Sequence, residues 1–247
     1  MKNMGEIEYS EVAPSKGQLV AKIGDRVTRF AYPPFRGTHP ECCRAIAQDK
    51  ELVPAEGFDL AILVHGAYTQ KSPQWVSVND NFRSDWIITP NRSLSIPVGY
   101  FEGDKALSGI LVERDLKGVG LSTKMQVPDL SGWKQNETGI YISPNGSAMF
   151  APSSSYKGRS FEKDGIAHAH LTPEGAELFA KTAKDAGLIP YNWLANRMED
   201  ITSTEQRVSL LLELVDGLDL SGDSWCDGRY NHAFGVFVSR EASAQKN

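Results

Sequence analysis

The segment from Asp164 to Gly187 constrains the fold most, because it contains the clearest helix start in the chain. The Thr172 hydroxyl can cap a helix, and Pro173 fits the first helical position, where an amide hydrogen is not needed. Gly187 is the predicted C-terminal stop. Apolar residues recur between them at helical spacing and predict one buried face: Ala176, Phe179, Ala180 and Ala183.

The residues just before this helix, Ile166–Leu171, alternate in a way that predicts a short strand. On a strand, His168 and His170 would share the face opposite the small apolar side chains. The nearby helix start would keep both imidazole rings neutral, which is the form that a metal ligand or a general base needs. The alternative is an ordinary polar strand face, because the H-x-H pattern is weak by itself.

This histidine pair supports a zinc-site hypothesis if it meets the polar segment 223–232 in space. Three protein ligands would leave a position open for a water molecule, as in catalytic zinc sites. Asp227 would then act as the base, or Asp164 would orient a ligand. The candidate ligands are His168, His170, Cys226 and His232, and the candidate catalytic residues are His168, His170 and Asp227.

A second candidate metal site lies near the N-terminus. Thr38 and Glu41 have capping-box spacing, which predicts a helix to about residue 48. On that helix, His39, Cys42 and Cys43 could share a face and bind a metal. The alternative is that the cysteines are ordinary buried core residues, because only three ligands are local.

Several other segments have a clear preference for one type of structure. Residues 18–23 and 26–32 predict a hairpin, and Asn145-Gly146 predicts another. Short apolar runs between 72 and 152 predict an antiparallel sheet, with strands expected at 85–89, 96–101, 107–114 and 121–127. Residues 54–68 and 204–216 carry apolar residues at helical spacing and predict helices.

Strands and helices thus come in runs rather than in regular alternation. We therefore expect an α+β fold, an antiparallel sheet with segregated helices packed on it. A chain of 247 residues can form one such domain. The alternative is a subdivision into residues 1–152 and 161–247, with Ser153–Ser160 as the boundary.

Composition limits the classes of partner. The net charge of −5 and the lack of a dense Lys/Arg run disfavour nucleic acid. Arginines 26, 29 and 36 lie among Phe30, Tyr32 and Phe35, but alternating charges on a strand explain this cluster more simply than base stacking. No apolar run is long enough for a membrane span, and no secretory signal is visible, so we expect a soluble cytoplasmic protein.

Common catalytic motifs are missing from the sequence. It has no G-x-S-x-G, H-E-x-x-H, C-x-x-C or phosphate-binding loop. We therefore expect a non-catalytic binding or structural domain that acts through association with another protein or with itself. The alternative is a metal- or histidine-assisted hydrolase using zinc, so the sequence leaves open whether the protein is an enzyme. The sequence does not indicate a small-molecule ligand.

Overall fold

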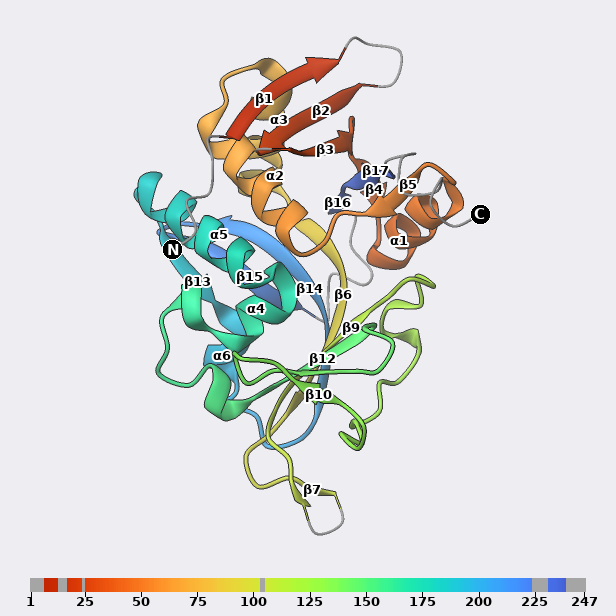
Figure 1. The fold of residues 1–247 in the computed structure, drawn as a ribbon, viewed down its shortest axis with the longest axis vertical. Coiled ribbons are helices and arrows are strands. Elements are labelled where there is room, and N and C mark those ends of the chain that lie inside the picture. The colour runs from red at the N-terminus through yellow and green to blue at the C-terminus, as the bar shows by residue number, and fades with distance from the viewer. Residues whose placement is uncertain (1–6, 13–16, 24, 103–104, 224–230, 239–247) are drawn as a thin grey trace.

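The computed structural model describes residues 7–12, 17–23, 25–102, 105–223 and 231–238. Their fold is α+β, with two main sheets that are mostly antiparallel and with helices packed on them (Figure 1). The predicted fold class is confirmed. The α-helices of the described part are α1 (His39–Gln48), α2 (Phe58–Thr69), α3 (Pro73–Ser84), α4 (Gly165–Leu171), α5 (Pro173–Asp185) and α6 (Trp193–Arg197).

The smaller sheet is built mainly from the N-terminal part of the chain. The predicted hairpin is confirmed, with antiparallel pairing from Gln18↔Ala31 to Ile23↔Arg26. A strand from the C-terminal part joins this sheet, so residues far apart in sequence share it. In spatial order its strands are β1 (Ile7–Val12), β2 (Gln18–Ile23), β3 (Arg26–Ala31), β17 (Gly235–Phe237) and β5 (Leu52–Pro54).

The larger sheet crosses the middle of the molecule (Figure 1). In order along its main path, its strands are β10 (Lys134–Gln135), β11 (Tyr141–Ile142), β12 (Ala148–Pro152), β9 (Gly109–Arg114), β6 (Ile87–Ile96), β14 (Glu205–Leu214), β15 (Gly217–Asp223) and β13 (Ile189–Asn192). The short strands β16 (Asn231–Ala233) and β4 (Phe35–Gly37) extend it beside β6, and β7 (Phe101–Glu102) and β8 (Lys105–Ala106) form a separate hairpin. The predicted Asn145-Gly146 turn joins β11 to β12 and is confirmed, with Gly146 at a φ of 69°.

Helix α2 lies in the interior, between the smaller sheet and helices α4 and α5 (Figure 1). Its residues from Leu60 to Val64 are all buried, so the helix is apolar on every side rather than along one stripe. Phe30 of β3 and Leu211 of β14 belong to the same core cluster as α2. One core therefore spans both sheets and the helices between them.

Two predicted helices are confirmed at their ends. Thr38 and Glu41 form the predicted capping box at the start of α1. Helix α5 begins at Pro173, and Gly187 follows its end with a φ of 75°. Local capping signals were reliable at both positions because they depend only on neighbouring residues.

The prediction of a helix over residues 204–216 was wrong, since this segment is strand β14. It pairs with β6 on one side and with β15 on the other, and Val208–Leu212 are all buried. A strand covered on both faces needs apolar residues throughout, so its sequence does not alternate. Such a run also satisfies helical spacing, which is why periodicity misassigned it.

The prediction of a strand over Ile166–Leu171 was also wrong, since this segment is helix α4. The Asp164 carboxylate accepts hydrogen bonds from the amides of Ile166 (2.7 Å) and Ala167 (3.0 Å), so it caps the helix. Residues two apart on a helix point in nearly opposite directions. His168 and His170 therefore do not share a face as predicted.

Two further differences concern the middle of the chain. Residues 121–127 form no strand, and a short 3-10 turn at Gly120–Ser122 replaces its start. Helix α3 was not predicted, although Ser72 and Pro73 stand at its start as a helix-starting pair. The glycine, proline and asparagine content of the surrounding region masked this local signal.

Candidate functional site

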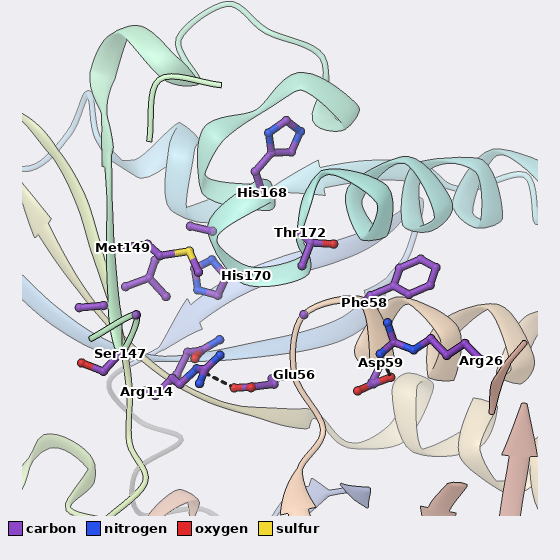
Figure 2. A pocket seen from close by; sticks show the side chains of 16 residues that line it. Arg26, Glu56, Phe58, Asp59, Arg114, Ser147, Met149, His168, His170 and Thr172 are labelled. Carbon is purple, nitrogen blue, oxygen red and sulfur yellow. Dashed lines mark hydrogen bonds and ion pairs between the residues drawn. The ribbon is translucent and has the colours of Figure 1, made fainter. Parts of the chain in front are cut away.

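A pocket of about 240 Å³ lies between α4, the start of α2 and strands β9 and β12 (Figure 2). Its wall combines charged, polar and apolar side chains from segments far apart in sequence. The lining includes Arg26, Glu56, Phe58, Asp59, Asn91 and Arg114.

Two ion pairs lie in the pocket wall. Arg114 Nε lies 2.9 Å from Glu56 Oε2, and Arg26 Nη2 lies 2.6 Å from Asp59 Oδ1 (Figure 2). The Arg26 guanidinium also lies 5.2 Å from the centre of the Phe58 ring. Both acidic residues come from one short segment at the start of α2, while the arginines come from different sheets. The pocket thus carries two positive and two negative groups.

The Glu56 carboxyl group is partly buried in the pocket wall. Burial raises its pKa, although the neighbouring Arg114 acts in the opposite direction. A carboxylate that has lost much of its hydration gains more from a positively charged partner than an exposed one does. The Glu56–Arg114 pair is therefore a suitable place for a ligand with charged groups to bind.

Asn91 adds a buried polar group from the central strand β6. Its side chain is almost fully buried and lines the pocket. Buried amides normally find hydrogen-bond partners in the protein or in bound molecules. Within the described residues, the Asn91 side chain makes no hydrogen bond to another part of the protein. It is thus available to a molecule in the pocket.

The backbone at the pocket is strained. Thr172 has φ 65° and ψ 164°, and among the described residues it is the one non-glycine residue with a positive φ. Such a conformation is normally adopted by glycine and costs about 1–3 kcal/mol. The strain falls at Thr172 because Pro173 follows it. A proline disfavours helical geometry at the residue before it, so α4 ends here. Opposite it, Gly57 has a φ of 54°, and a Cβ there would lie 3.2 Å from Thr172 Cγ2.

His170 is fully engaged by the protein. Its Nδ1 lies 2.9 Å from the Ile166 carbonyl oxygen, which can only accept, so Nδ1 carries the proton. Its Nε2 therefore accepts from the Ser209 hydroxyl at 2.9 Å. Burial lowers the pKa of His170 to about 4, so the ring is neutral at pH 7. Ser209 is itself completely buried, which makes this bond a structural link between α4 and β14.

His168 lies on the other side of α4. Its Nε2 is 3.0 Å from the Glu162 carbonyl oxygen, and Figure 2 shows its ring turned away from the other labelled side chains. Its buried Nδ1 has no hydrogen-bond partner. Both histidines line the pocket, but their ring nitrogens contact different neighbours, as their helical spacing requires.

The remaining predicted site residues are not brought together by the described part of the structure. His232 Nε2 lies 3.2 Å from Asp85 Oδ2, and Asp164 caps α4 rather than facing a metal. Cys226 and Asp227 lie outside the described residues. Zinc binding by His168, His170, Cys226 and His232, with Asp227 as a base, therefore stays a prediction.

The charged residues of the pocket were missed by sequence reasoning. Glu56 and Arg114 are 58 positions apart, and no motif spacing connects them. A partial signal was present, since a glycine separates Glu56 from the start of α2 and positive-φ glycines often lie beside binding sites. The pairing itself depends on the approach of β9 to the start of α2, which only the folded chain provides.

Searches with this chain matched no family model, no curated protein and no solved structure. Within the described residues, we find no helix with the length and apolar character needed to span a bilayer.

Replacing the strained Thr172 by glycine should stabilise the protein by about 1 kcal/mol. Glycine relieves the backbone strain, and losing the capping hydroxyl costs only a few tenths of a kcal/mol. The free energy of unfolding in urea measures this change. Thr69→Gly, at an exposed helix end with ordinary backbone geometry, is the matched control and should destabilise instead. Destabilisation by both variants would contradict the strain at Thr172.

His170 should make stability depend on pH. Because its folded-state pKa of about 4 lies below the unfolded value near 6.5, its stabilising contribution is complete above pH 6.5 and is lost as the pH falls toward 4. The full shift corresponds to roughly 3 kcal/mol of unfolding free energy. Urea unfolding from pH 7 to pH 4 should therefore show a smaller loss for His170→Gln than for the unchanged protein. Equal losses would show that His170 does not titrate in this way.

Proposed function

We propose that the protein is a non-catalytic binding domain and that the pocket beside α4 binds a small zwitterionic molecule. The observation that carries this proposal is the arrangement of Glu56–Arg114 and Arg26–Asp59 around one cavity. A ligand carboxylate would bind an arginine, preferably in a bidentate manner, while a ligand amine would bind an acidic group.

The size of the pocket agrees with a small ligand. At about 240 Å³ it lies below the roughly 300–1,000 Å³ that is typical for drug-sized molecules. Phe58 and Met149 add apolar surface beside the charges. An α-amino acid combines all the required features in a small volume: a carboxylate, an ammonium group and a compact side chain.

The state of His170, one of the two histidines that line the pocket, favours binding over catalysis. His170 uses both ring nitrogens for contacts inside the protein, so neither is directed at a bound molecule. A general base must lie within hydrogen-bond reach of the proton that it removes. The hydrolase alternative therefore depends on His168 and on residues outside the described part of the chain, Cys226 and Asp227.

Individual α-amino acids, tested by thermal shift and calorimetry, provide the probe for this pocket. We expect at least one to stabilise the protein, with about 2.7 kcal/mol gained at a concentration 100-fold above its Kd. Arg114→Gln should weaken its binding more than tenfold, because a charge-assisted hydrogen bond contributes about 1.5–3 kcal/mol.

Arg83→Gln is the matched control, since it breaks a comparable pair with Glu213 (3.1 Å) outside the pocket. This variant should bind like the unchanged protein. If no amino acid binds, or if the two variants lose affinity equally, the proposal for this pocket is wrong.

Association between two copies of the chain is the second candidate function. Strand β13 ends the order of the larger sheet, and its Ile189 and Tyr191 side chains are 62% and 40% exposed. Val215, in the adjacent turn between β14 and β15, is 95% exposed. An edge strand with exposed apolar side chains is prone to pair with a second strand.

Sedimentation velocity over a range of concentrations tests this association. We expect concentration-dependent dimers that Ile189→Lys reduces by at least about tenfold in affinity, because a charge on an edge strand opposes pairing. Val53→Lys, at an exposed apolar position on the edge of the smaller sheet, is the control and should leave the dimer intact. A monomer at all concentrations would rule out this interface.

A further inference from the structure

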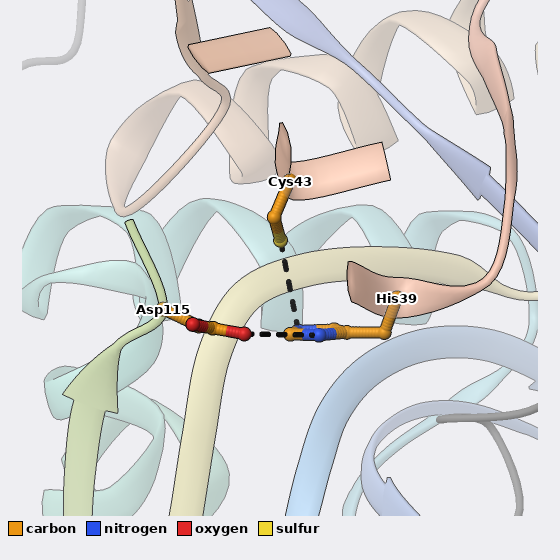
Figure 3. A group of neighbouring side chains, drawn as sticks. All are labelled: His39, Cys43 and Asp115. Atoms are coloured by element: carbon orange, nitrogen blue, oxygen red, sulfur yellow. Dashed lines mark hydrogen bonds and ion pairs between the residues drawn. The ribbon is translucent and has the colours of Figure 1, made fainter. Parts of the chain in front are cut away.

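A second cluster of reactive side chains lies where α1 packs against the loop that follows β9. Figure 3 shows His39, Cys43 and Asp115 directed toward one another. All three are almost completely buried, with exposed fractions of 0%, 3% and 2%. Cys43 Sγ lies 3.9 Å from His39 Nε2, and His39 Nδ1 lies 3.5 Å from Asp115 Oδ2.

We propose that His39, Cys43 and Asp115 bind a divalent metal ion of the zinc class. Each residue offers one ligand atom, and these atoms all lie within 4.8 Å of one another. Imidazole nitrogen, thiolate sulfur and carboxylate oxygen are the three donor types that zinc accepts in proteins. This site is separate from the pocket beside α4 and does not depend on the function proposed for it.

The distances agree with this assignment. Zinc bonds of about 2.3 Å to sulfur and 2.0–2.1 Å to nitrogen, at a tetrahedral angle, place the two ligand atoms about 3.6 Å apart. The sulfur and the nearer nitrogen of His39 are 3.9 Å apart. Because the two ring nitrogens face different neighbours, the ion binds one of them, and small side-chain movements bring the third ligand into place. The fourth position is then left for water.

Charge balance gives a reason for these groups to be buried together. An ionised carboxylate and thiolate carry two negative charges, whose burial without partners is strongly unfavourable. One divalent cation neutralises both of them and leaves His39 neutral, which is the state that binds metal. The site therefore couples metal binding to the packing of α1 on the loop.

The surroundings of Asp115 hold its carboxylate in a fixed position. Oδ1 accepts a hydrogen bond from the Val119 amide (2.9 Å), and Oδ2 accepts one from the Gly120 amide (2.7 Å). Arg92 in turn donates to the Gly120 carbonyl at 2.9 Å, and Arg44 of α1 donates to the Gly118 carbonyl. Hydrogen bonds of this kind orient the ligands of metal sites.

Cys42 provides an internal control because it lies next to Cys43 but outside the cluster. Its thiol donates to the Phe35 carbonyl oxygen at 3.8 Å. Of these two neighbouring cysteines, Cys43 is the one that faces His39 and Asp115, so it is the expected ligand.

Cobalt(II) binding tests the proposal, because a thiolate ligand gives cobalt a charge-transfer absorption in the near ultraviolet. The full-length protein is stripped with a chelator, then unfolded and refolded with Co²⁺, so that burial of the site does not prevent entry. We expect the absorption to saturate at one ion per chain and to disappear when Zn²⁺ replaces Co²⁺. Cys43→Ser should abolish it, while Cys42→Ser and Cys226→Ser should retain it.

Asp115→Asn is a second test that preserves the shape of the site and one of the two oxygen acceptors for the backbone amides. It should weaken Co²⁺ binding at least about tenfold, the lower range for changes around metal ligands. The proposal is overturned if the unchanged protein gives no saturable absorption. It is also overturned if the absorption depends on Cys42 or Cys226, or if Asp115→Asn binds with unchanged affinity.

Discussion

The hydrogen bonds accepted by the Asp164 carboxylate determine where α4 begins and how it is attached to the larger sheet. It caps α4 through two amides and accepts a third hydrogen bond from Asn192 Nδ2 at 3.0 Å. Burial raises its pKa, while these three donors act in the opposite direction. One side chain thus fixes the start of α4 and joins it to β13 at the sheet edge. The strained Thr172 then fixes where α4 ends and α5 begins.

Between these two points, α4 carries its polar side chains into the interior rather than toward solvent. His170 reaches Ser209 on β14, and Asn91 of β6 lies in the wall of the pocket next to it. A group of polar side chains therefore lies between α4 and the larger sheet, within an otherwise apolar core. Buried polar groups usually need a partner, and His170 has one at each ring nitrogen, whereas the Asn91 side chain is left to a molecule in the pocket.

The sequence was sufficient for elements governed by neighbouring residues. The Thr38–Glu41 capping box, the Thr172-Pro173 helix start and the Asn145-Gly146 turn all lie where they were predicted. The sequence was insufficient where burial by distant segments decides whether a segment forms a helix or a strand. The Leu-rich strand β14 is covered on both faces, so its pattern resembles that of a helix.

The same limit applies to the candidate sites. His39 and Cys43 share a helix face, as their i, i+4 spacing predicted, but Asp115 joins them only through the folded loop after β9. His168 and His170 were grouped by an alternation that α4 does not follow. No motif or spacing in the sequence connects Glu56 with Arg114. Spacing therefore identified pairs within one element, and tertiary contacts supplied the rest.

The two ion pairs of the pocket have a mechanical consequence. Arg26 belongs to the smaller sheet and Arg114 to the larger one, while Glu56 and Asp59 precede or begin the helix between them. Each pair therefore links one of the two sheets to the same end of α2. A molecule that exchanged either pair for its own charges would remove one of these links, and its binding would favour arrangements of the chain in which that link is absent.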